Sequence, residues 1–309
     1  MQTEFVSDLV IIDYLELLNS TVATSEALGI SQSSCSRRYR AFSDQCGFNF
    51  DRIGDRYQPT SNLDILSNLR QASQRMRVRQ AQMRFSRGWQ MGEMNLPGLT
   101  RFGVDLDVRW MNSWRMLSLL EQRLLDVAVM GILEFQGMMT QSLTRLRLGK
   151  HSIGQSMMCI PLCIYELQLL AHTEHPLLDH NDNINPDQLA TYPSPAISIG
   201  SAPMLMQALH AHGLANQQSG LTQYHESKWE GFAANGIGLS YAAPFLLPEL
   251  MKRYQLCPVR YPLGIKDCLA LVGHVDVLSD PKFGATFRGL LAEIQRVLGT
   301  TVSGLRWLG

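Results

Sequence analysis

The pattern of apolar and polar positions at the start of the chain predicts two short helices joined by a turn. Apolar residues recur at helical spacing as far as residue 18, and the pattern stops at Asn19-Ser20, a pair that favours turns and caps. Ser20 or Thr21 can cap a second helix as far as Leu28. Gly29 then has the backbone freedom that a tight reversal needs.

A third helix with two different faces is predicted after its cap, Ser31. Its apolar positions fall three or four apart and form one buried stripe, which consists of Cys35, Tyr39, Phe42 and Cys46. The opposite face carries polar and basic side chains, namely Gln32, Ser33, Ser34, Ser36, Arg37, Arg38 and Arg40. Because Gln and Arg can form bidentate hydrogen bonds with base edges, and Ser and Arg can hold phosphates, this face suits the major groove of DNA. A helical hairpin with a basic face in an unrelated protein is the alternative.

A longer helix is predicted after Pro59. Ser61 and Asp64 have the spacing of a capping box. An interrupted apolar seam follows, made of Leu63, Leu66, Leu69, Ala72, Met76 and Met83. Because the seam is narrow, it suits a partner helix better than a globular core, and it predicts a homodimer. A solvent-exposed linker is the alternative.

From Met83 onward, short β-rich runs alternate with helical stretches, which predicts an α/β sheet with crossover helices. The expected strands are Arg84–Trp89, Val104–Trp110, Leu125–Gly131, Leu167–Ala171, Ala196–Gly200, Ile237–Tyr241 and Cys268–Gly273. The expected helices are Ser113–Arg123, Met204–His212, Ala243–Tyr254 and Thr286–Leu298.

Charge is distributed unevenly along a chain whose formal net charge is zero. Residues 37–87 contain eleven Arg and only four acidic residues, so this is the stretch where a polyanion would bind. A solvated, charged helix face is the alternative. No apolar run is long enough to predict a membrane span, and the first residues do not resemble an export signal, so we expect a cytoplasmic protein without a membrane partner.

The candidate chemical groups do not predict an enzyme. The six cysteines form no Cys-x-x-Cys pair, and we expect buried thiols, with a redox-sensing thiol at Cys268 beside Asp267 as the less favoured alternative. A crowded segment, His172, His175, Asp179, His180 and Asp182, matches no familiar metal-ligand spacing. We therefore expect no metal, no cofactor and no catalytic residue.

Two N-terminal segments resemble LysR-type transcriptional regulators. ATSEALGISQSSCSRRYRAF, Ala23 to Phe42, is similar to the helix-turn-helix of that family, and GFNFDRIGDRYQPT, Gly47 to Thr60, resembles its wing. The resemblance implies a winged helix-turn-helix DNA-binding domain at residues 1–61 and a dimerising linker helix at 62–88. It also implies that Arg52 and Arg56 of the wing lie along phosphates or the minor groove.

The later part of the chain resembles the effector-binding domain of the same family. The similar segments are Gln168 to Pro193 and NGIGLSYAAPFLL, Asn235 to Leu247. The resemblance implies that residues 89–309 form two Rossmann-like lobes, arranged as in periplasmic binding proteins. Lobe I would comprise about 89–162 and 266–309, and lobe II about 163–265. The fold class expected for the whole chain is α+β multidomain.

The resemblance also places an effector site between the lobes. The implied effector-binding residues are Gln90, Gly92, Glu93, Met130, Gly131, Ser198, Gly200, Ser201, Ser227 and Lys228. Backbone N–H groups at Gly200-Ser201, ahead of a helix that begins near Met204, could hold an anion, and an ordinary turn is the alternative.

The function implied by this resemblance is transcription regulation through double-stranded DNA in response to a small-molecule effector. The implied partners are a second copy of the chain in a homodimer, a homotetramer and RNA polymerase. An enzyme, or a solute-binding α/β protein with a fused helical head, is the alternative.

Overall fold

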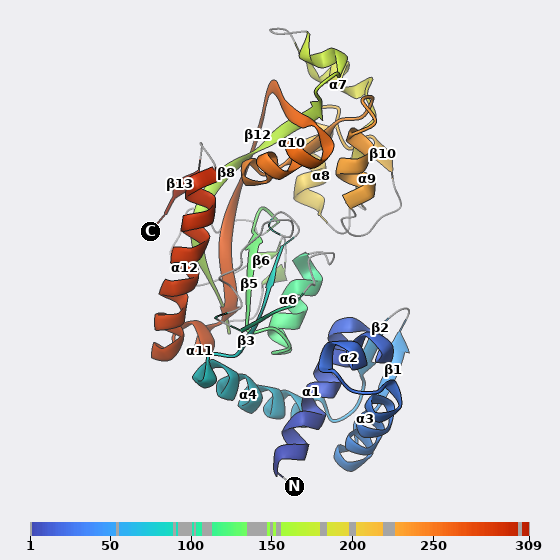
Figure 1. Cartoon of the computed structure of the whole chain (residues 1–309), viewed down its shortest axis with the longest axis vertical. Helices are drawn as coiled ribbons and strands as arrows, with labels where there is room; N and C mark the ends of the chain where they lie inside the picture. The colour runs from blue at the N-terminus through green and yellow to red at the C-terminus, as the bar shows by residue number, and fades with distance from the viewer. Residues whose placement is uncertain are drawn as a thin grey trace.

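A computed structural model gives the structure, and it describes residues 2–53, 56–88, 91, 101, 103–106, 113–134, 147–148, 151–152, 156–179, 184–197, 202–218, 226–301 and 305–308. An N-terminal head, residues 2–59, consists of three helices and a hairpin (Figure 1). Its elements are α1 (Gln2–Leu18), α2 (Thr21–Leu28), α3 (Gln32–Cys46), β1 (Phe50–Ile53) and β2 (Arg56–Pro59). The two strands are antiparallel.

Local sequence signals set the ends of the head's helices. The side chains of Ser20 and Ser31 each accept a hydrogen bond from the backbone N–H three residues further on, which caps α2 and α3. Both helices end at a glycine in the left-handed region, Gly29 with φ 64° and Gly47 with φ 67°. The predicted end of α2 at Leu28 and the predicted cap of α3 at Ser31 are therefore confirmed, and Ser20 rather than Thr21 caps α2.

The helix after the head is α4 (Leu63–Gln80), and its start differs from the prediction. The expected capping box is absent, because Ser61 Oγ accepts from Asn49 N and donates to Gly47 O. Asn62 at the N-cap makes no side-chain cap bond. At the other end α4 stops before Met83, which is buried in a strand and therefore does not belong to the helical seam.

The described residues between 83 and 308 form the α/β part, whose largest sheet is mixed and has seven strands. The strands run in the order β11-β8-β12-β5-β3-β4, and β13 pairs with β8. Their bounds are β3 (Met83–Arg87), β4 (Gly103–Asp105), β5 (Val127–Gly131), β8 (Met157–His172), β11 (Ser240–Ala242), β12 (Leu256–His274) and β13 (Arg306–Trp307). Strand β3 is parallel to β4 and β5, whereas β12 is antiparallel to β5 and β8.

Helices and short strands surround this sheet (Figure 1). The helices are α6 (Ser113–Glu121), η2 (Pro176–Leu178), α7 (Pro186–Ala190), α8 (Pro203–His210), α9 (Glu226–Ala233), η3 (Pro244–Leu246), α10 (Leu247–Tyr254), α11 (Val275–Leu278) and α12 (Pro281–Thr301). The short strands are β6 (Arg147–Leu148), β7 (His151–Ser152), β9 (Pro195–Ala196) and β10 (Gln217–Gln218). The head lies at one end of the molecule and α7 at the other.

Two expected strands are wrong in length. The runs expected at 167–171 and 268–273 are only parts of β8 and β12, which have 16 and 19 residues. Prolines interrupt the strand pattern in the sequence, and the pairing accommodates Pro258 and Pro262 by shifts of register. The expected helix at 243–254 is divided into η3 and α10. The expected strands at 104–110 and 196–200 lie partly outside the described residues.

The described residues form three apolar clusters in the interior. The largest lies around β8 and β12, and a small one holds the head together through Leu9, Ile12 and Phe42. The third joins Tyr14 and Leu17 of α1 to apolar residues of α6, β5 and β12, so the head and the α/β part share a core. Within the described chain, no helix has the length and hydropathy of a membrane span.

Candidate nucleic-acid interface and ligand site

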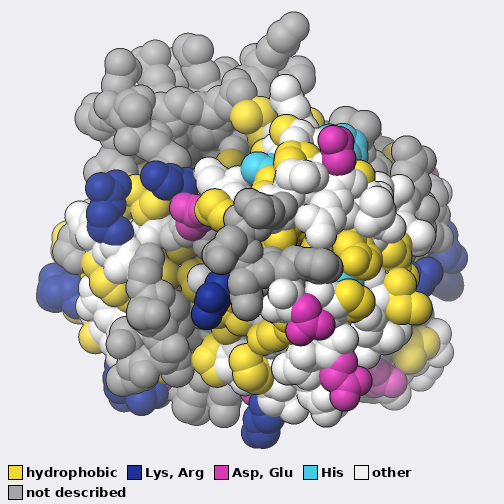
Figure 2. All heavy atoms as spheres, turned by 90° about the horizontal axis from the view of Figure 1, so that it is seen from above, with side chains coloured by type: hydrophobic (Ala, Val, Ile, Leu, Met, Phe, Trp, Pro, Cys, Tyr) yellow, Lys and Arg dark blue, Asp and Glu magenta, His cyan; other side chains and the backbone are white. Residues whose placement is uncertain are grey.

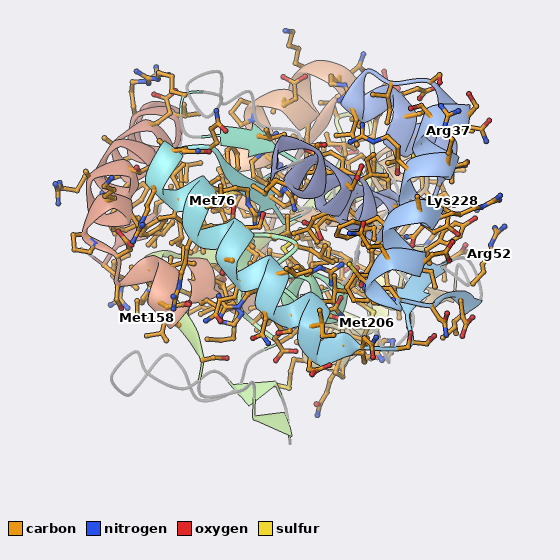
Figure 3. The ribbon with its side chains drawn as sticks, turned by 90° about the horizontal axis from the view of Figure 1, so that it is seen from below. Arg37, Arg52, Met76, Met158, Met206 and Lys228 are labelled. Atoms are coloured by element: carbon orange, nitrogen blue, oxygen red, sulfur yellow. The ribbon has the colours of Figure 1, made fainter. Side chains whose placement is uncertain are left out.

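One face of α3 is open to solvent. Gln32, Ser33, Arg37 and Arg40 are exposed, and Ser34, Ser36 and Arg38 are half-buried. The opposite side is anchored by Cys35 and Phe42, which are 0% and 1% exposed. The structure therefore separates α3 into the buried stripe and the polar face that the sequence predicts. Arg37 projects outward from the head, as does Arg52 of the hairpin (Figure 3).

Arg38 is the exception on this face, because it is bound to α1. Its Nε lies 2.7 Å from Asp8 Oδ1, and its Nη2 donates to Ser7 Oγ at 2.6 Å. Arg38 is among the residues expected to contact DNA, and in the structure its guanidinium also joins α3 to α1. Gln32 keeps an exposed position although its Nε2 donates to Thr21 Oγ1 at 3.3 Å.

The hairpin projects beside α3. Arg52 is exposed on β1, and Arg56 begins β2, with a side chain outside the described atoms. The hairpin is held to the turn between α1 and α2, because Tyr57 N donates to Asn19 Oδ1 at 3.1 Å. Tyr39 of α3 contacts Phe50 edge to face, with ring centroids 6.2 Å apart.

The arginines of residues 37–87, where we expect a polyanion to bind, have different surroundings in the structure. Arg70, Arg77 and Arg84 form buried ion pairs, so they do not offer their charge to a polyanion, and Arg38 forms a partly exposed pair with Asp8. Arg37, Arg40, Arg52, Arg75 and Arg79 are exposed. At the end of the molecule opposite the head, basic side chains stand in separate small groups rather than in one continuous patch (Figure 2).

Few of the expected effector-binding residues can be located. Gln90, Gly92, Glu93, Ser198, Gly200 and Ser201 lie outside the described residues. Met130 and Gly131 are at the end of β5, where Met130 is buried. Ser227 and Lys228 belong to the first turn of α9 rather than to a turn between elements, and Lys228 is exposed.

A buried carboxylate that the sequence did not predict lies just after β5. Glu134 is 8% exposed, and its two oxygens accept hydrogen bonds from Met204 N and Leu205 N, both at 3.0 Å, at the start of α8. Burial raises the pKa of Glu134, and the two backbone hydrogen bonds oppose this shift. The first backbone N–H groups of α8 thus hold a carboxylate of the chain itself, whereas the anion site expected at Gly200-Ser201 lies outside the described residues.

A second buried carboxylate, Asp267, lies close to Glu134 and contributes to raising the pKa of Glu134. It accepts hydrogen bonds from Tyr165 Oη at 2.7 Å, from Ile132 N at 2.9 Å and from Cys268 N at 2.7 Å. Burial raises the pKa of Asp267, and these donors oppose the rise. A β-carbon added at Gly131 would lie 2.2 Å from Asp267 Oδ2, so only glycine fits beside it. No sequence pattern distinguishes these carboxylates from surface residues, because their partners are far away along the chain.

The thiols near this group are buried. Burial raises the pKa of Cys159, Cys163 and Cys268 to about 12, and Asp267 adds to the rise at Cys268. Because a thiolate is the reactive form, this environment does not support a redox role for Cys268. His175 is also structural, since its Nδ1 accepts from Leu177 N and its Nε2 lies 3.1 Å from Ile237 O. The described residues contain no group of His, Cys, Asp and Glu able to hold a metal.

Comparison with known proteins identifies the fold. No protein-family model and no curated protein sequence matches this chain. A full-length OxyR variant from Pseudomonas aeruginosa has 14% identity and a TM-score of 0.52, over 94% of this chain and 97% of that one. ArgP from Mycobacterium tuberculosis has 15% identity and a TM-score of 0.52, over 97% and 98%. A probable transcriptional regulator from Pseudomonas aeruginosa has 16% identity and a TM-score of 0.52, over 92% and 95%.

These similarities confirm, at the level of the fold, the resemblance found in the sequence. The chain has the mixed α/β fold of full-length LysR-type regulators.

Proposed function

We propose that this chain is a LysR-type transcription regulator that binds double-stranded DNA through its head. The observation that carries the proposal is the polar and basic face of α3, where Gln32, Ser33, Arg37 and Arg40 are exposed while Cys35 and Phe42 on the opposite side are buried. In this proposal residues 1–61 are a winged helix-turn-helix domain, 62–88 a linker helix and 89–309 an effector-binding domain. The protein would act in the cytoplasm and not as an enzyme.

The proposed DNA contacts begin at the N-terminal end of α3. Side chains near the start of a recognition helix reach base edges, and Gln32 and Ser33 occupy that end. Arg37 and Arg40 lie further along the exposed face, where they can contact bases or phosphates. Arg52 and Arg56 of the hairpin would lie along the backbone of the duplex or in the minor groove.

The proposed assembly uses the outer face of α4. Ile65 and Met76 are 44% and 46% exposed, Ala72 is exposed and Leu69 is half-buried. Their spacing of four, three and four residues is that of a helix-pairing seam. Met76 lies on α4 as shown in Figure 3. A homodimer through this seam would place two heads on one duplex, at half-sites about 10 bp or a multiple apart. We also propose that the chain assembles into a homotetramer and that it contacts RNA polymerase.

The proposed effector is a small molecule held between two lobes. Lobe I would comprise about 89–162 and 266–309, and lobe II about 163–265, so Glu134 and α8 belong to opposite lobes. Their hydrogen bonds support this location, since they join the two proposed lobes at a point where anions are favoured. Gln90, Gly92, Glu93, Met130, Gly131, Ser198, Gly200, Ser201, Ser227 and Lys228 remain the proposed ligand neighbourhood.

The test is a footprint of the purified protein on the DNA just upstream of its own gene, with and without metabolites from a cell extract. We expect two protected half-sites and a change of footprint length or DNA bending when the effector is present. A variant with alanine at Gln32, Arg37 and Arg40 should fold and give no footprint. Unaltered affinity in that variant would remove the proposed reading face.

A further inference from the structure

The contact between the head and the α/β part contains several buried charges. Among the described residues, three carboxylates and the three guanidinium groups that form ion pairs with them meet there, and we call these six the joint cluster: Asp13, Glu16, Arg70, Arg77, Arg84 and Asp126. All the carboxylates are 0% or 1% exposed, and the arginine side chains are between 3% and 11% exposed. The six formal charges cancel, which is the condition for burying so many of them.

One residue of the head contacts the other two parts of the molecule at once. Asp13 Oδ1 lies 2.9 Å from Arg70 Nε of α4, and Asp13 Oδ2 lies 2.6 Å from Arg84 Nη1 of β3. Each carboxylate oxygen therefore has its own guanidinium partner. Burial raises the pKa of Asp13, but Arg84 and Arg70 outweigh it and hold that pKa below its usual value.

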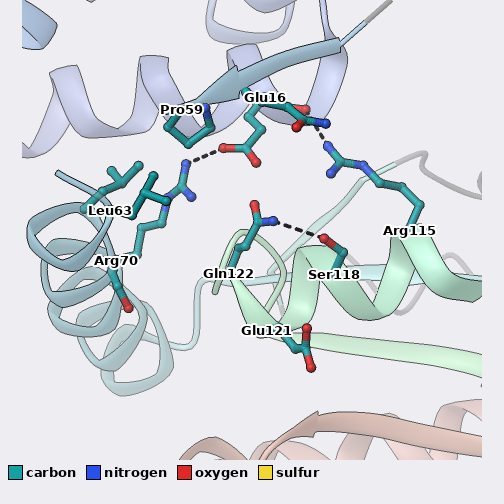
Figure 4. Close-up of a pocket in the computed structure, with 11 residues that line it drawn as sticks. Glu16, Pro59, Leu63, Arg70, Arg115, Ser118, Glu121 and Gln122 are labelled. Atoms are coloured by element: carbon teal, nitrogen blue, oxygen red, sulfur yellow. Dashed lines mark hydrogen bonds and ion pairs between the residues drawn. The ribbon is translucent and has the colours of Figure 1, made fainter. Parts of the chain in front are cut away.

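Glu16, one helical turn further along α1, makes a second bridge of the same kind. Its Oε2 lies 2.8 Å from Arg70 Nη2, and its backbone oxygen accepts from Arg115 Nη2 of α6 at 3.0 Å (Figure 4). A cleft of about 540 Å³ opens beside these groups, between α1, β2, α4 and α6. Head, linker and α/β part thus meet at one place.

The remaining ion pair fixes α4 to the sheet. Arg77 donates through Nε and Nη2 to the two oxygens of Asp126, at 2.9 and 2.6 Å. Asp126 Oδ2 also accepts from Arg84 N at 2.8 Å, so one carboxylate binds α4 and the start of β3 together. Arg84 in turn lies over the ring of Tyr14, 5.3 Å from its centroid.

Apolar contacts and buried charges have different roles at this contact. Tyr14 and Leu17 share a core with Met116, Leu120 and other residues of the α/β part, and this burial supplies the attraction. Buried ion pairs add little net attraction, because desolvation offsets it, but a single misplaced partner leaves an unpaired charge in the interior. The joint cluster therefore tolerates only one orientation of α1 against the sheet.

We propose that the joint cluster is a positioning device, which fixes the direction of α3 relative to the sheet of the same chain. The connection continues from α1 to α3 through Arg38, Asp8 and the core of the head. A shift of β3 or β5 would therefore move α3 as part of one rigid body. The value of this device for regulation rests on the proposed function, whereas the device itself depends on the contacts alone.

Hydrogen exchange of the full chain without DNA tests the inference. We expect amides of α1 in the wild type to be protected to the same order of magnitude as those of β5. Arg84→Lys keeps the charge and leaves the Asp13–Arg70 pair in place, but it removes the guanidinium geometry at the joint. In this variant, exchange in α1 and α3 should accelerate about tenfold while β8 and β12 change less than about twofold.

Asp13→Asn removes both ion pairs and should give a larger acceleration confined to the same helices. Arg296→Lys is the control, because the exposed Arg296 pairs with Glu293 within α12, 2.8 Å away and outside the joint cluster. It should leave exchange in the head unaltered. Fast exchange of the head in the wild type, or an equal loss of protection in head and sheet with Arg84→Lys, would overturn the inference. Absence of DNA binding would overturn only the proposed function.

Discussion

At the scale of single residues, two neighbouring arginines of α3 have opposite surroundings. Arg37 is exposed, whereas Arg38 is bound to Asp8 and Ser7. We expect Arg37→Ala to weaken DNA binding by about 1–3 kcal/mol if it contacts a base, without changing the midpoint of urea unfolding. Arg38→Ala should lower the free energy of unfolding by at most about 1 kcal/mol, since its ion pair is one-third exposed. Titration of both variants against the operator measures the DNA affinity, and urea unfolding measures the stability. An equal effect of the two substitutions on DNA affinity would contradict the assignment.

Glu134 gives a prediction about pH. Its pKa is raised in the folded state above the ordinary value of 4.5, mainly by burial, so the folded protein keeps this proton at pH values where the unfolded chain has lost it. Stability from this group is therefore full at low pH and falls as pH rises from about 4.5 through the raised pKa.

Glu134→Gln removes that dependence, and it also costs about 1 kcal/mol because an amide oxygen accepts only one of the two N–H groups. We expect the free energy of unfolding of the wild type, relative to that of the variant, to decrease as pH rises through this range. Urea unfolding at a series of pH values provides the measurement, with the exposed Glu26→Gln as a control. A difference between wild type and variant that stays constant with pH would refute the prediction.

At the scale of elements, two glycines with open surroundings should respond to alanine in opposite directions. Gly29 ends α2 with φ 64°, and Gly284 lies inside α12, and a β-carbon at either position meets nothing within 4 Å. Gly29→Ala should destabilise the chain by about 1 kcal/mol, because only the backbone conformation is strained. Gly284→Ala should stabilise it by about 0.5–1 kcal/mol through helix propensity. Urea unfolding measures the change in the free energy of unfolding for each variant. Changes of the same sign would contradict the backbone conformation described.

The helical elements of the head could be predicted because their signals are local. Ser20, Gly29 and Ser31 act within four residues of their own positions, and the sequence contains them in order. The lengths of β8 and β12 could not be predicted, because Pro258 and Pro262 break the sequence pattern and only the paired strand shows how a register shift absorbs them.

The candidate site could be predicted only where its residues are contiguous in the sequence. Helical spacing alone predicts the polar face of α3, and Gln32, Arg37 and Arg40 of that face are exposed in the structure. Whether another arginine is exposed or buried in an ion pair depends on partners far away along the chain. Arg70 lies 57 residues from Asp13, and no local pattern distinguishes it from a surface arginine. Glu134 was missed for the same reason, since its partners are 70 and 71 residues away.

At the scale of the whole molecule, the proposed dimer depends on a face of α4 that the chain itself leaves uncovered. Ala72 is exposed on that face, so Ala72→Glu should not disturb the monomer, whereas in a dimer it would place like charges opposite each other across the seam. We expect at least about a tenfold weaker association, measured by sedimentation velocity. Ala211→Glu, at an exposed alanine that ends α8, is the matched control and should leave association unaltered. Identical sedimentation of the two variants would exclude this seam.

Strands β8 and β12 have a further consequence for how this protein can be divided or evolve. They pair with each other over most of their length, from Leu256 with His172 to His274 with Met157. A cut that separated the two ends of the sheet would divide both strands. Their backbone N–H and C=O groups would then lack partners at exposed strand edges, which promotes aggregation. Neither end of the sheet can therefore be expressed or exchanged alone, and recombination with a related gene would have to replace the two together.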